Sequence, residues 1–140
     1  EWWLSLDIED VNNEGVSGAP IEYFYEKVRD RNFKTVILFL GFNNIKHSDQ
    51  SIESISDKYK ILIKNIDAER IIIIGVPYME HAKSNIWYIE GSWITDYRIK
   101  QFNDSIKILG DDYIDTSDVK TVDGIHPEYE KIIERLNNIL

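Results

Sequence analysis

Two short runs of apolar residues along the chain predict buried β-strands. They are TVILFL at residues 35–40 and RIIIIGV at residues 70–76, and both are rich in β-branched side chains. Continuous apolar runs of this length are typical of a parallel sheet that is covered on both faces. Weaker patterns predict a third strand at residues 112–116 and a short strand near Val11.

Apolar residues at helical spacing lie before, between and after these runs. A period of three to four residues predicts amphipathic helices, and Asp49 or Ser51 is the expected cap of the second one. The expected apolar faces are Ile21, Phe24 and Val28; Ile52, Ile55, Tyr59 and Leu62; Ile99, Phe102, Ile106 and Leu109; and Tyr129, Ile132, Ile133, Leu136 and Leu140. The alternation of strands and helices predicts an α/β fold with a parallel sheet, in one domain that spans residues 1–140. Ligands of such sheets bind beyond the carboxyl ends of the strands, so the segments after Leu40, Val76 and Thr116 are where a site is expected.

The composition narrows the range of partners and cofactors. The formal net charge of −9 disfavours nucleic acids and anionic membranes as partners. The chain has no cysteine, which excludes disulfides and thiol catalysis and leaves a cytoplasmic or a secreted location equally compatible. His47 and His81 lack metal-ligand spacing, and no phosphate-binding glycine loop is present. We therefore expect neither a metal nor a cofactor.

Two of the polar segments at the expected sheet edge contain glycine and asparagine. In GFNN, residues 41–44, the Asn43 amide can donate hydrogen bonds into a crevice, as in an oxyanion hole, although a simple turn explains the same residues. In NNEGVSGAP, residues 12–20, the backbone N–H of Gly18 can point into the same crevice, although a glycine-containing loop is the alternative.

The third segment, VDGIHP, places a histidine three residues after a carboxylate. A histidine acts as a base through one ring nitrogen when a partner holds the other. Asp123, folded back by the turn at Gly124, can supply that partner to His126. A structural turn, with Pro127 at the start of a helix, is the alternative.

Together, the three segments resemble conserved blocks of the SGNH/GDSL hydrolases, a family of serine esterases, lipases and acetylhydrolases. NNEGVSG resembles the second block, GFNN the third (usually Gly-x-Asn-Asp) and DGIHP the fifth (Asp-x-x-His). The resemblance runs from about residue 2 to the C-terminus. It implies a three-layer α/β/α sandwich around a flavodoxin-like sheet. It also implies that His126 is the general base, that Asp123 orients it, and that Asn43 and the Gly18 N–H bind the oxyanion. Asn44 stands where the family usually has Asp, and we expect it to support the loop.

The family's first block, Gly-Asp-Ser, does not occur in the chain. Ser5 has no preceding Gly-Asp and is separated from Gly18 by only 12 residues, and Ser17 lies inside the glycine block. We therefore expect the nucleophilic serine, and the central first strand of the 2-1-3-4-5 sheet, upstream of Glu1. An upstream segment, a partner chain or a rearranged dimer is expected to complete the sheet, because unpaired strand edges are costly when buried.

The expected function is hydrolysis of small acyl esters, with acetyl esters of carbohydrates suggested by family analogy. The 140 residues by themselves are expected to be inactive. The alternative is a non-catalytic binding or assembly module, a degenerate relative that has lost its serine. The aromatic residues of the segment 78–97 either form a wall for a sugar or acyl group or pack that segment onto the sheet.

Overall fold

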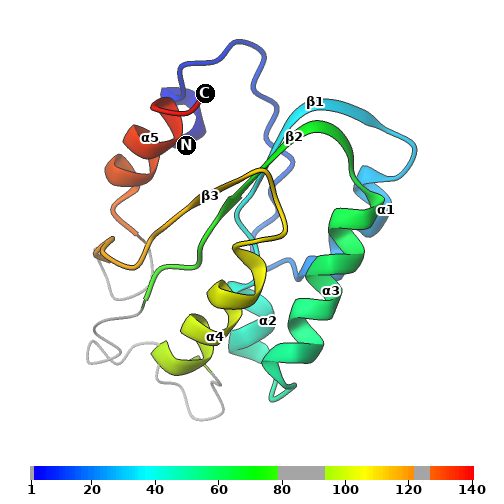
Figure 1. The fold of residues 1–140 in the computed structure, drawn as a ribbon, viewed down its shortest axis with the longest axis vertical. Coiled ribbons are helices and arrows are strands. Elements are labelled where there is room, and N and C mark those ends of the chain that lie inside the picture. Colours follow the sequence, from blue (N-terminus) through cyan, green and yellow to red (C-terminus); the bar gives the residue numbers. More distant parts are fainter. Residues whose placement is uncertain (1, 79–93, 122–126) are drawn as a thin grey trace.

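The computed structural model describes residues 2–78, 94–121 and 127–140 (Figure 1). The described part is a mixed α/β fold with a three-stranded parallel sheet. Its elements, in chain order, are the 3₁₀ helices η1 (Trp2–Ser5) and η2 (Ile21–Phe24), helix α1 (Tyr25–Val28), strand β1 (Asn32–Leu38), helices α2 (Phe42–His47) and α3 (Ile52–Asn65), strand β2 (Asp67–Ile74), helix α4 (Asp96–Ile106), strand β3 (Asp112–Ile114) and helix α5 (Tyr129–Asn137).

The sheet has the order β1-β2-β3, with both pairs parallel. Its three strands were all predicted from the apolar runs. The strand expected near Val11 is not formed, because residues 11–16 have no regular secondary structure. Polar side chains satisfy this segment locally instead: Asn13 Oδ1 accepts from the Gly15 backbone N–H at 2.9 Å, a bond that competes with strand pairing.

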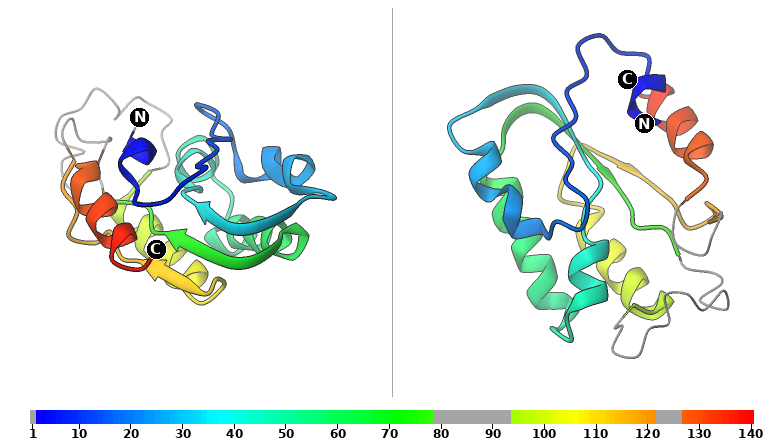
Figure 2. Two further views of the ribbon diagram at one scale, coloured as in Figure 1. Left: turned by 90° about the horizontal axis from the view of Figure 1, so that it is seen from above. Right: turned by 180° about the vertical axis from the view of Figure 1, so that it is seen from behind.

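Side chains from alternate positions along the strands lie in two separate hydrophobic clusters, one on each face of the sheet. Figure 2 shows α3 and α4 on one side of the sheet and α5 on the other. The first cluster joins Leu38 and Ile73 to residues of η2, α1, α2, α3 and α4, namely Ile21, Phe24, Val28, Ile45, Ile55, Tyr59, Leu62, Ile99, Phe102 and Ile106. The second cluster joins Ile72, Ile74 and Ile114 to Leu6, Val119, Ile132 and Leu136. The predicted apolar helix faces therefore lie in or against the core, although Leu109 lies beyond the end of α4 and Leu140 beyond the end of α5.

Side-chain caps determine where the two longest helices begin. Ser51 Oγ accepts from the Ser54 N–H at 3.1 Å, so Ser51 rather than Asp49 caps α3. Thr95 Oγ1 accepts from the Arg98 N–H at 3.2 Å at the start of α4. In the described part of the chain, no helix is long and apolar enough to cross a membrane.

The N-terminal segment packs against the C-terminal helix. The Trp2 ring stacks on Tyr129 with a centroid distance of 5.7 Å and meets the edge of Phe39 at 6.2 Å. Asn137 accepts from the Asp7 N–H at 2.7 Å and donates to the Ser5 carbonyl at 3.2 Å. The two ends of the chain therefore lie side by side (Figures 1 and 2).

Candidate active site

The turn between β1 and α2 places the asparagines of GFNN. Gly41 has a φ of +118°, which a residue with a side chain rarely adopts, and the buried ring of Phe102 packs directly against it. The chain then enters α2, so Asn43 and Asn44 lie in the first turn of a helix. The two asparagines therefore belong to a short helix rather than to an isolated turn.

Asn44 links α2 to the segment that contains Gly18. Its side chain is buried, its Oδ1 accepts from the Ile21 backbone N–H at 2.9 Å, and its Nδ2 donates to Glu22 Oε1 at 3.0 Å. The N–H of Ile21 is one of the unpaired donors at the start of η2, and Asn44 satisfies it across 23 residues of sequence. The expectation that Asn44 supports the loop is confirmed.

Asn43 contacts the same segment one residue from Gly18. Its Nδ2 donates to the Ala19 carbonyl at a long 3.4 Å. Gly18 itself has a φ of +77° in a turn closed by the Ala19 N–H and the Val16 carbonyl at 3.2 Å, which fits the third position of a type II turn. Gly18 therefore lies in a loop turn, directly before the residue that Asn43 contacts.

Buried polar side chains hold the carboxyl ends of β2 and β3. Asn103 in α4 accepts from the Val76 N–H at 2.9 Å and donates to the Val76 carbonyl at 2.8 Å. Thr116 Oγ1 donates to the Gly75 carbonyl at 2.8 Å. Neither role was predicted from the sequence. The available signal was a polar residue at position 103, next to Phe102 on the buried side of an amphipathic helix.

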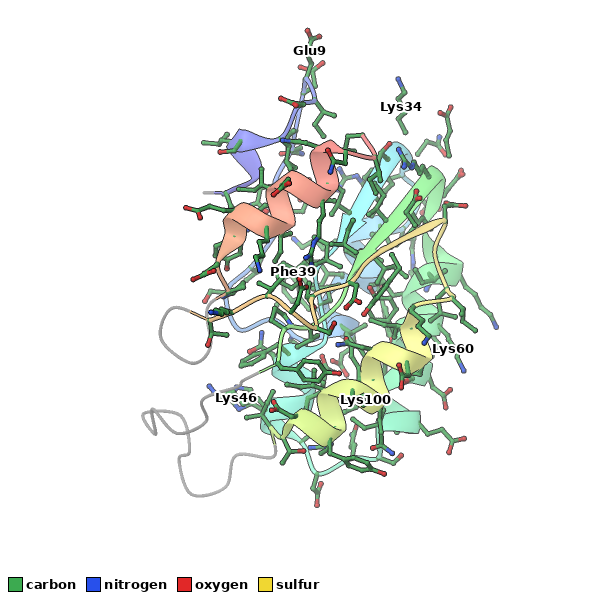
Figure 3. The ribbon with its side chains drawn as sticks, turned by 60° about the vertical axis from the view of Figure 1, so that its left-hand side comes forward. Glu9, Lys34, Phe39, Lys46, Lys60 and Lys100 are labelled. Atoms are coloured by element: carbon green, nitrogen blue, oxygen red, sulfur yellow. The ribbon has the colours of Figure 1, made fainter. Side chains whose placement is uncertain are left out.

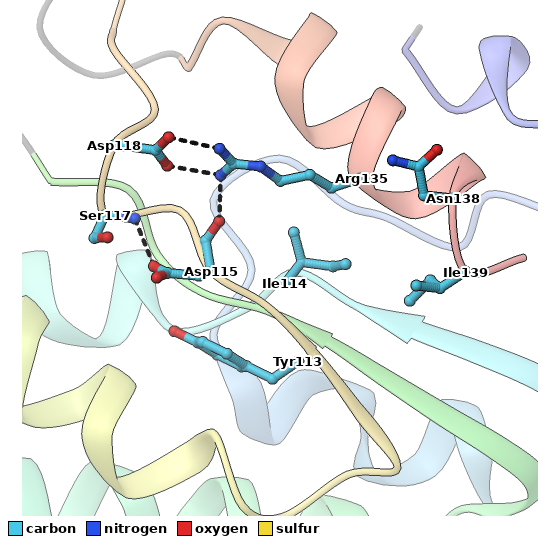
Figure 4. A pocket seen from close by; sticks show the side chains of 8 residues that line it. All are labelled: Tyr113, Ile114, Asp115, Ser117, Asp118, Arg135, Asn138 and Ile139. Carbon is cyan, nitrogen blue, oxygen red and sulfur yellow. Dashed lines mark hydrogen bonds and ion pairs between the residues drawn. The ribbon is translucent and has the colours of Figure 1, made fainter.

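The loop after β3 is fastened to α5 by an ion pair. Arg135 donates to the two carboxylate oxygens of Asp118 at 2.7 and 2.6 Å and to the Asp115 carbonyl at 2.6 Å (Figure 4). The Arg135 guanidinium holds the pKa of the Asp118 carboxyl down at about 2. These residues line a shallow hollow of about 410 Å³ at the outer side of β3.

The predicted acid–base pair lies outside the described residues. Asp123 and His126 both fall in the range 122–126. The residues that flank this range are paired: Thr121 and Pro127 form an antiparallel bridge, and the Glu128 N–H donates to the Lys120 carbonyl at 2.8 Å. Both flanks are thus held beside the carboxyl end of the parallel sheet, through the Asp118–Arg135 pair and α5.

A second hollow, of about 400 Å³, lies at the start of α4. It is lined by Tyr78, Asp96, Tyr97 and Lys100. Burial raises the pKa of the Tyr78 hydroxyl, whereas the Tyr97 ring is largely exposed. Two residues of the predicted aromatic wall therefore lie together here, and Trp87, Tyr88 and Trp93 lie outside the described residues.

The remaining candidate residues lie on the surface of the described part of the chain. Ser5 and Ser17 are exposed, and Ser5 belongs to η1 rather than to a strand end. His47 is exposed and is the last residue of α2. Within residues 2–78, 94–121 and 127–140, no group of histidine and carboxylate side chains could hold a metal ion.

Comparisons of the chain with protein-family models, curated proteins and solved structures give no match. What the chain does is therefore inferred from its own residues and contacts. The described contacts bring the side-chain amide of Asn43 next to the turn that contains Gly18, where β1 leads into α2. Amide donors of this kind stabilise a developing negative charge on an oxygen atom.

Proposed function

We propose that this chain is the larger part of an SGNH/GDSL-type serine ester hydrolase that acts on small acyl esters. The observation that carries the proposal is the pair of contacts from Asn43 to Ala19 and from Asn44 to Ile21. These contacts join the two segments that resemble the second and third family blocks, although β1 separates them in the sequence. By analogy with the family, the substrate class is acetyl esters, including those of carbohydrates.

The residues then take distinct roles in acyl transfer. His126 removes the proton from a serine hydroxyl, and Asp123 holds the imidazole in the required tautomer. The serine attacks the acyl carbonyl, and water later hydrolyses the acyl-enzyme. A carboxamide nitrogen carries two hydrogens, so Asn43 can donate one to Ala19 and the other to the oxyanion. The N–H of Gly18 is the second proposed donor.

The composition of β1 supports a further strand beside it. The part of β1 from Thr35 to Leu38 contains no charged residue and no proline, as in an interior strand, and the one charged residue of β1, Lys34, lies near its start. Figure 3 shows Lys34 projecting outward near the start of β1 and Phe39 within the molecule beyond its end. Among the described residues, β1 pairs with β2 along one edge and with no strand along the other.

We propose that the strand that completes the sheet also brings the nucleophilic serine. It comes from an upstream segment, from a partner chain or from a rearranged dimer. Paired with the open edge of β1, it gives the 1-3-4-5 part of the flavodoxin-like order 2-1-3-4-5, with helices on both faces as in a three-layer α/β/α sandwich, and strand 2 of that order must pair with its other edge. A parallel strand there ends at the same edge as β1, and so beside Asn43.

Hydrolysis of p-nitrophenyl acetate by the full-length protein that contains these residues tests the proposal. We expect His126→Ala to lower kcat by about 10³-fold or more, and Asn43→Ala to lower it by about 10²- to 10³-fold. The matched control is His47→Ala, which removes an exposed histidine and should leave the rate unchanged. A fluorophosphonate label, located by peptide mass spectrometry, should mark a serine in a Gly-Asp-Ser sequence outside the 140 residues.

Two results would overturn this function. One is a full-length protein that neither hydrolyses the ester nor takes up the label, which would favour a non-catalytic binding or assembly module. The other is robust, His126-dependent hydrolysis by the 140 residues alone, which would show that their own serines include the nucleophile.

A further inference from the structure

A chain of polar contacts runs from α3 to the candidate oxyanion donors. Lys58 Nζ lies 2.6 Å from Glu22 Oε2, and the other oxygen of Glu22 accepts from Asn44 Nδ2 at 3.0 Å. Asn44 Oδ1 in turn accepts from the Ile21 N–H at 2.9 Å. Three elements, α3, η2 and α2, are therefore connected through two charged side chains and one amide.

The donor and acceptor chemistry of this chain specifies an amide at position 44. An ammonium group only donates, and an ionised carboxylate only accepts. The side chain between Glu22 and the Ile21 N–H must therefore donate on one side and accept on the other. Asparagine does both. An aspartate could accept from Ile21, but its second oxygen would face the Glu22 carboxylate at hydrogen-bond distance.

We propose that Glu22 and Lys58 are positioning residues, which act through Asn44 to hold Asn43 and the Gly18 turn in register. The carboxylate at position 22 is then the reason that position 44 carries Asn where the resembled family usually has Asp. By register we mean the position of the Asn43 amide relative to the Gly18 turn. Its importance for catalysis rests on the proposed function, whereas the contacts that fix it are observed independently of that function.

Burial makes the chain of contacts more than a surface ion pair. Asn44 is only 6% exposed, and the side chains of Lys58 and Glu22 are 28% and 35% exposed. Burial by itself would raise the pKa of the Glu22 carboxyl, but hydrogen bonds from Lys58, from the backbone and from Asn44 outweigh it and lower the pKa. Tyr25 also faces this carboxylate, and its pKa is raised by burial and by the charge of Glu22. Glu22 is thus held ionised as the acceptor that Asn44 requires.

The register matters because Asn43 and Asn44 reach adjacent points of one segment. Asn44 fixes Ile21, while Asn43 contacts Ala19 only through a long bond of 3.4 Å. The shorter and more buried contact therefore sets how α2 lies against the turn, and the weaker contact follows it. If Asn44 loses its partner at Glu22, the Asn43 amide and the Gly18 N–H shift relative to each other.

Two substitutions that exchange the donor and acceptor roles of residues 22 and 44 test the proposal in the full-length protein. Asn44→Asp places two carboxylates together, and we expect the unfolding equilibrium constant at pH 7 to rise about ten- to hundred-fold. The defect should shrink near pH 4.5, where the two carboxylates can share a proton. In the double variant with Glu22→Gln, the amide introduced at position 22 can donate to the carboxylate introduced at position 44. The unfolding equilibrium constant should then return to within about three-fold of the wild-type value. A variant that is unfolded at pH 7 and refolds when Glu22→Gln is added supports the proposal equally.

Asn12→Asp is the matched control. Asn12 also donates to a glutamate, Glu14, at 2.9 Å, but this pair is exposed, so the substitution should change the unfolding constant less than two-fold. A comparable loss of stability in this control, or no rescue of Asn44→Asp by Glu22→Gln, would refute the claim that Glu22 requires an amide side chain at position 44.

Amide resonances separate positioning from a purely structural role. In ¹H–¹⁵N spectra, the Gly18 N–H and the Asn43 side-chain NH₂ should shift in Asn44→Asp and return in the double variant. Unmoved resonances beside a clear stability defect would refute the positioning role. In an active enzyme, kcat should fall in Asn44→Asp and recover in the double variant, with KM nearly constant. If the proposed function is wrong, the wild-type protein will not hydrolyse the ester. The amide resonances would still test whether Glu22 and Lys58 position Asn43 and the Gly18 turn.

Discussion

Replacement of Gly41 by alanine should be among the most damaging single-methyl changes in this protein. Gly41 joins β1 to α2 with a φ of +118°, a conformation that costs a residue with a side chain about 1–2 kcal/mol. A Cβ atom there would also overlap the Phe102 ring, lying 2.5 Å from its Cζ atom and closer still to Cε1. Overpacking of a core typically costs about 1–3 kcal/mol, so Gly41→Ala should lower the free energy of unfolding by about 2–5 kcal/mol.

The ring of Phe102 has little freedom to relieve this overlap. It is fully buried and meets the ring of Tyr59 edge-on, with a centroid distance of 5.8 Å. A domain of this size has a total stability of about 5–15 kcal/mol. The substitution therefore removes a large share of it, and it also displaces the start of α2, which carries Asn43.

Gly18→Ala provides the matched control for the Gly41 substitution. Gly18 also has a positive φ, +77°, but no atom lies within 4 Å of the position that its Cβ would occupy. Its substitution should cost only the backbone penalty of about 1–2 kcal/mol. Urea unfolding of the full-length variants, followed by circular dichroism at 222 nm, measures both losses.

A double-mutant cycle with Phe102→Leu assigns the difference to the ring. Part of the cost of Gly41→Ala should disappear when Phe102 is already leucine, with a coupling free energy of at least about 1 kcal/mol. Equal losses for Gly41→Ala and Gly18→Ala, or an additive cycle, would refute the reasoning that the ring requires glycine at position 41.

Two further predictions concern tyrosine hydroxyl groups and the Asp118–Arg135 ion pair. The Tyr59 hydroxyl is fully buried and, among the described residues, has no hydrogen-bond partner. Tyr59→Phe should therefore raise the free energy of unfolding, measured by thermal or urea unfolding, by about 1 kcal/mol. The control Tyr25→Phe removes a 3.0 Å hydrogen bond to the Lys58 carbonyl and should lower the free energy of unfolding by a similar amount. A loss of stability in Tyr59→Phe would show that its hydroxyl is satisfied. The pKa of Asp118, about 2, lies below the unfolded value of 3.8, so its pairing with Arg135 adds stability above about pH 4 that disappears as the pH falls towards 2. In Arg135→Gln, the pKa of Asp118 measured by carbon-13 NMR titration should rise towards 3.8. An unchanged pKa would contradict the pairing.

Much of the candidate site's framework was predictable from the sequence. The apolar run before Gly41 located the end of β1 to within two residues, and the Gly-Asn pattern after it located the entry into α2. The predicted meeting of Asn43 with the Gly18 segment is also observed, because consecutive elements of a parallel α/β fold share one edge of the sheet. Asp123 and His126 lie outside the described residues, and their roles rest on their spacing and the family resemblance.

Local periodicity alone predicted the three strands and the apolar helix faces, because each depends on residues a few positions apart. It left Asp49 and Ser51 as alternative caps of α3, and the structure selects Ser51. The tertiary structure decided the partners of polar side chains: Asn44 with Ile21 and Glu22, and Asn103 with Val76. It also decided that the segment around Val11 remains without strand structure. A buried amide must find its donor and acceptor among groups that the fold brings close in space, and no local pattern records which groups those are.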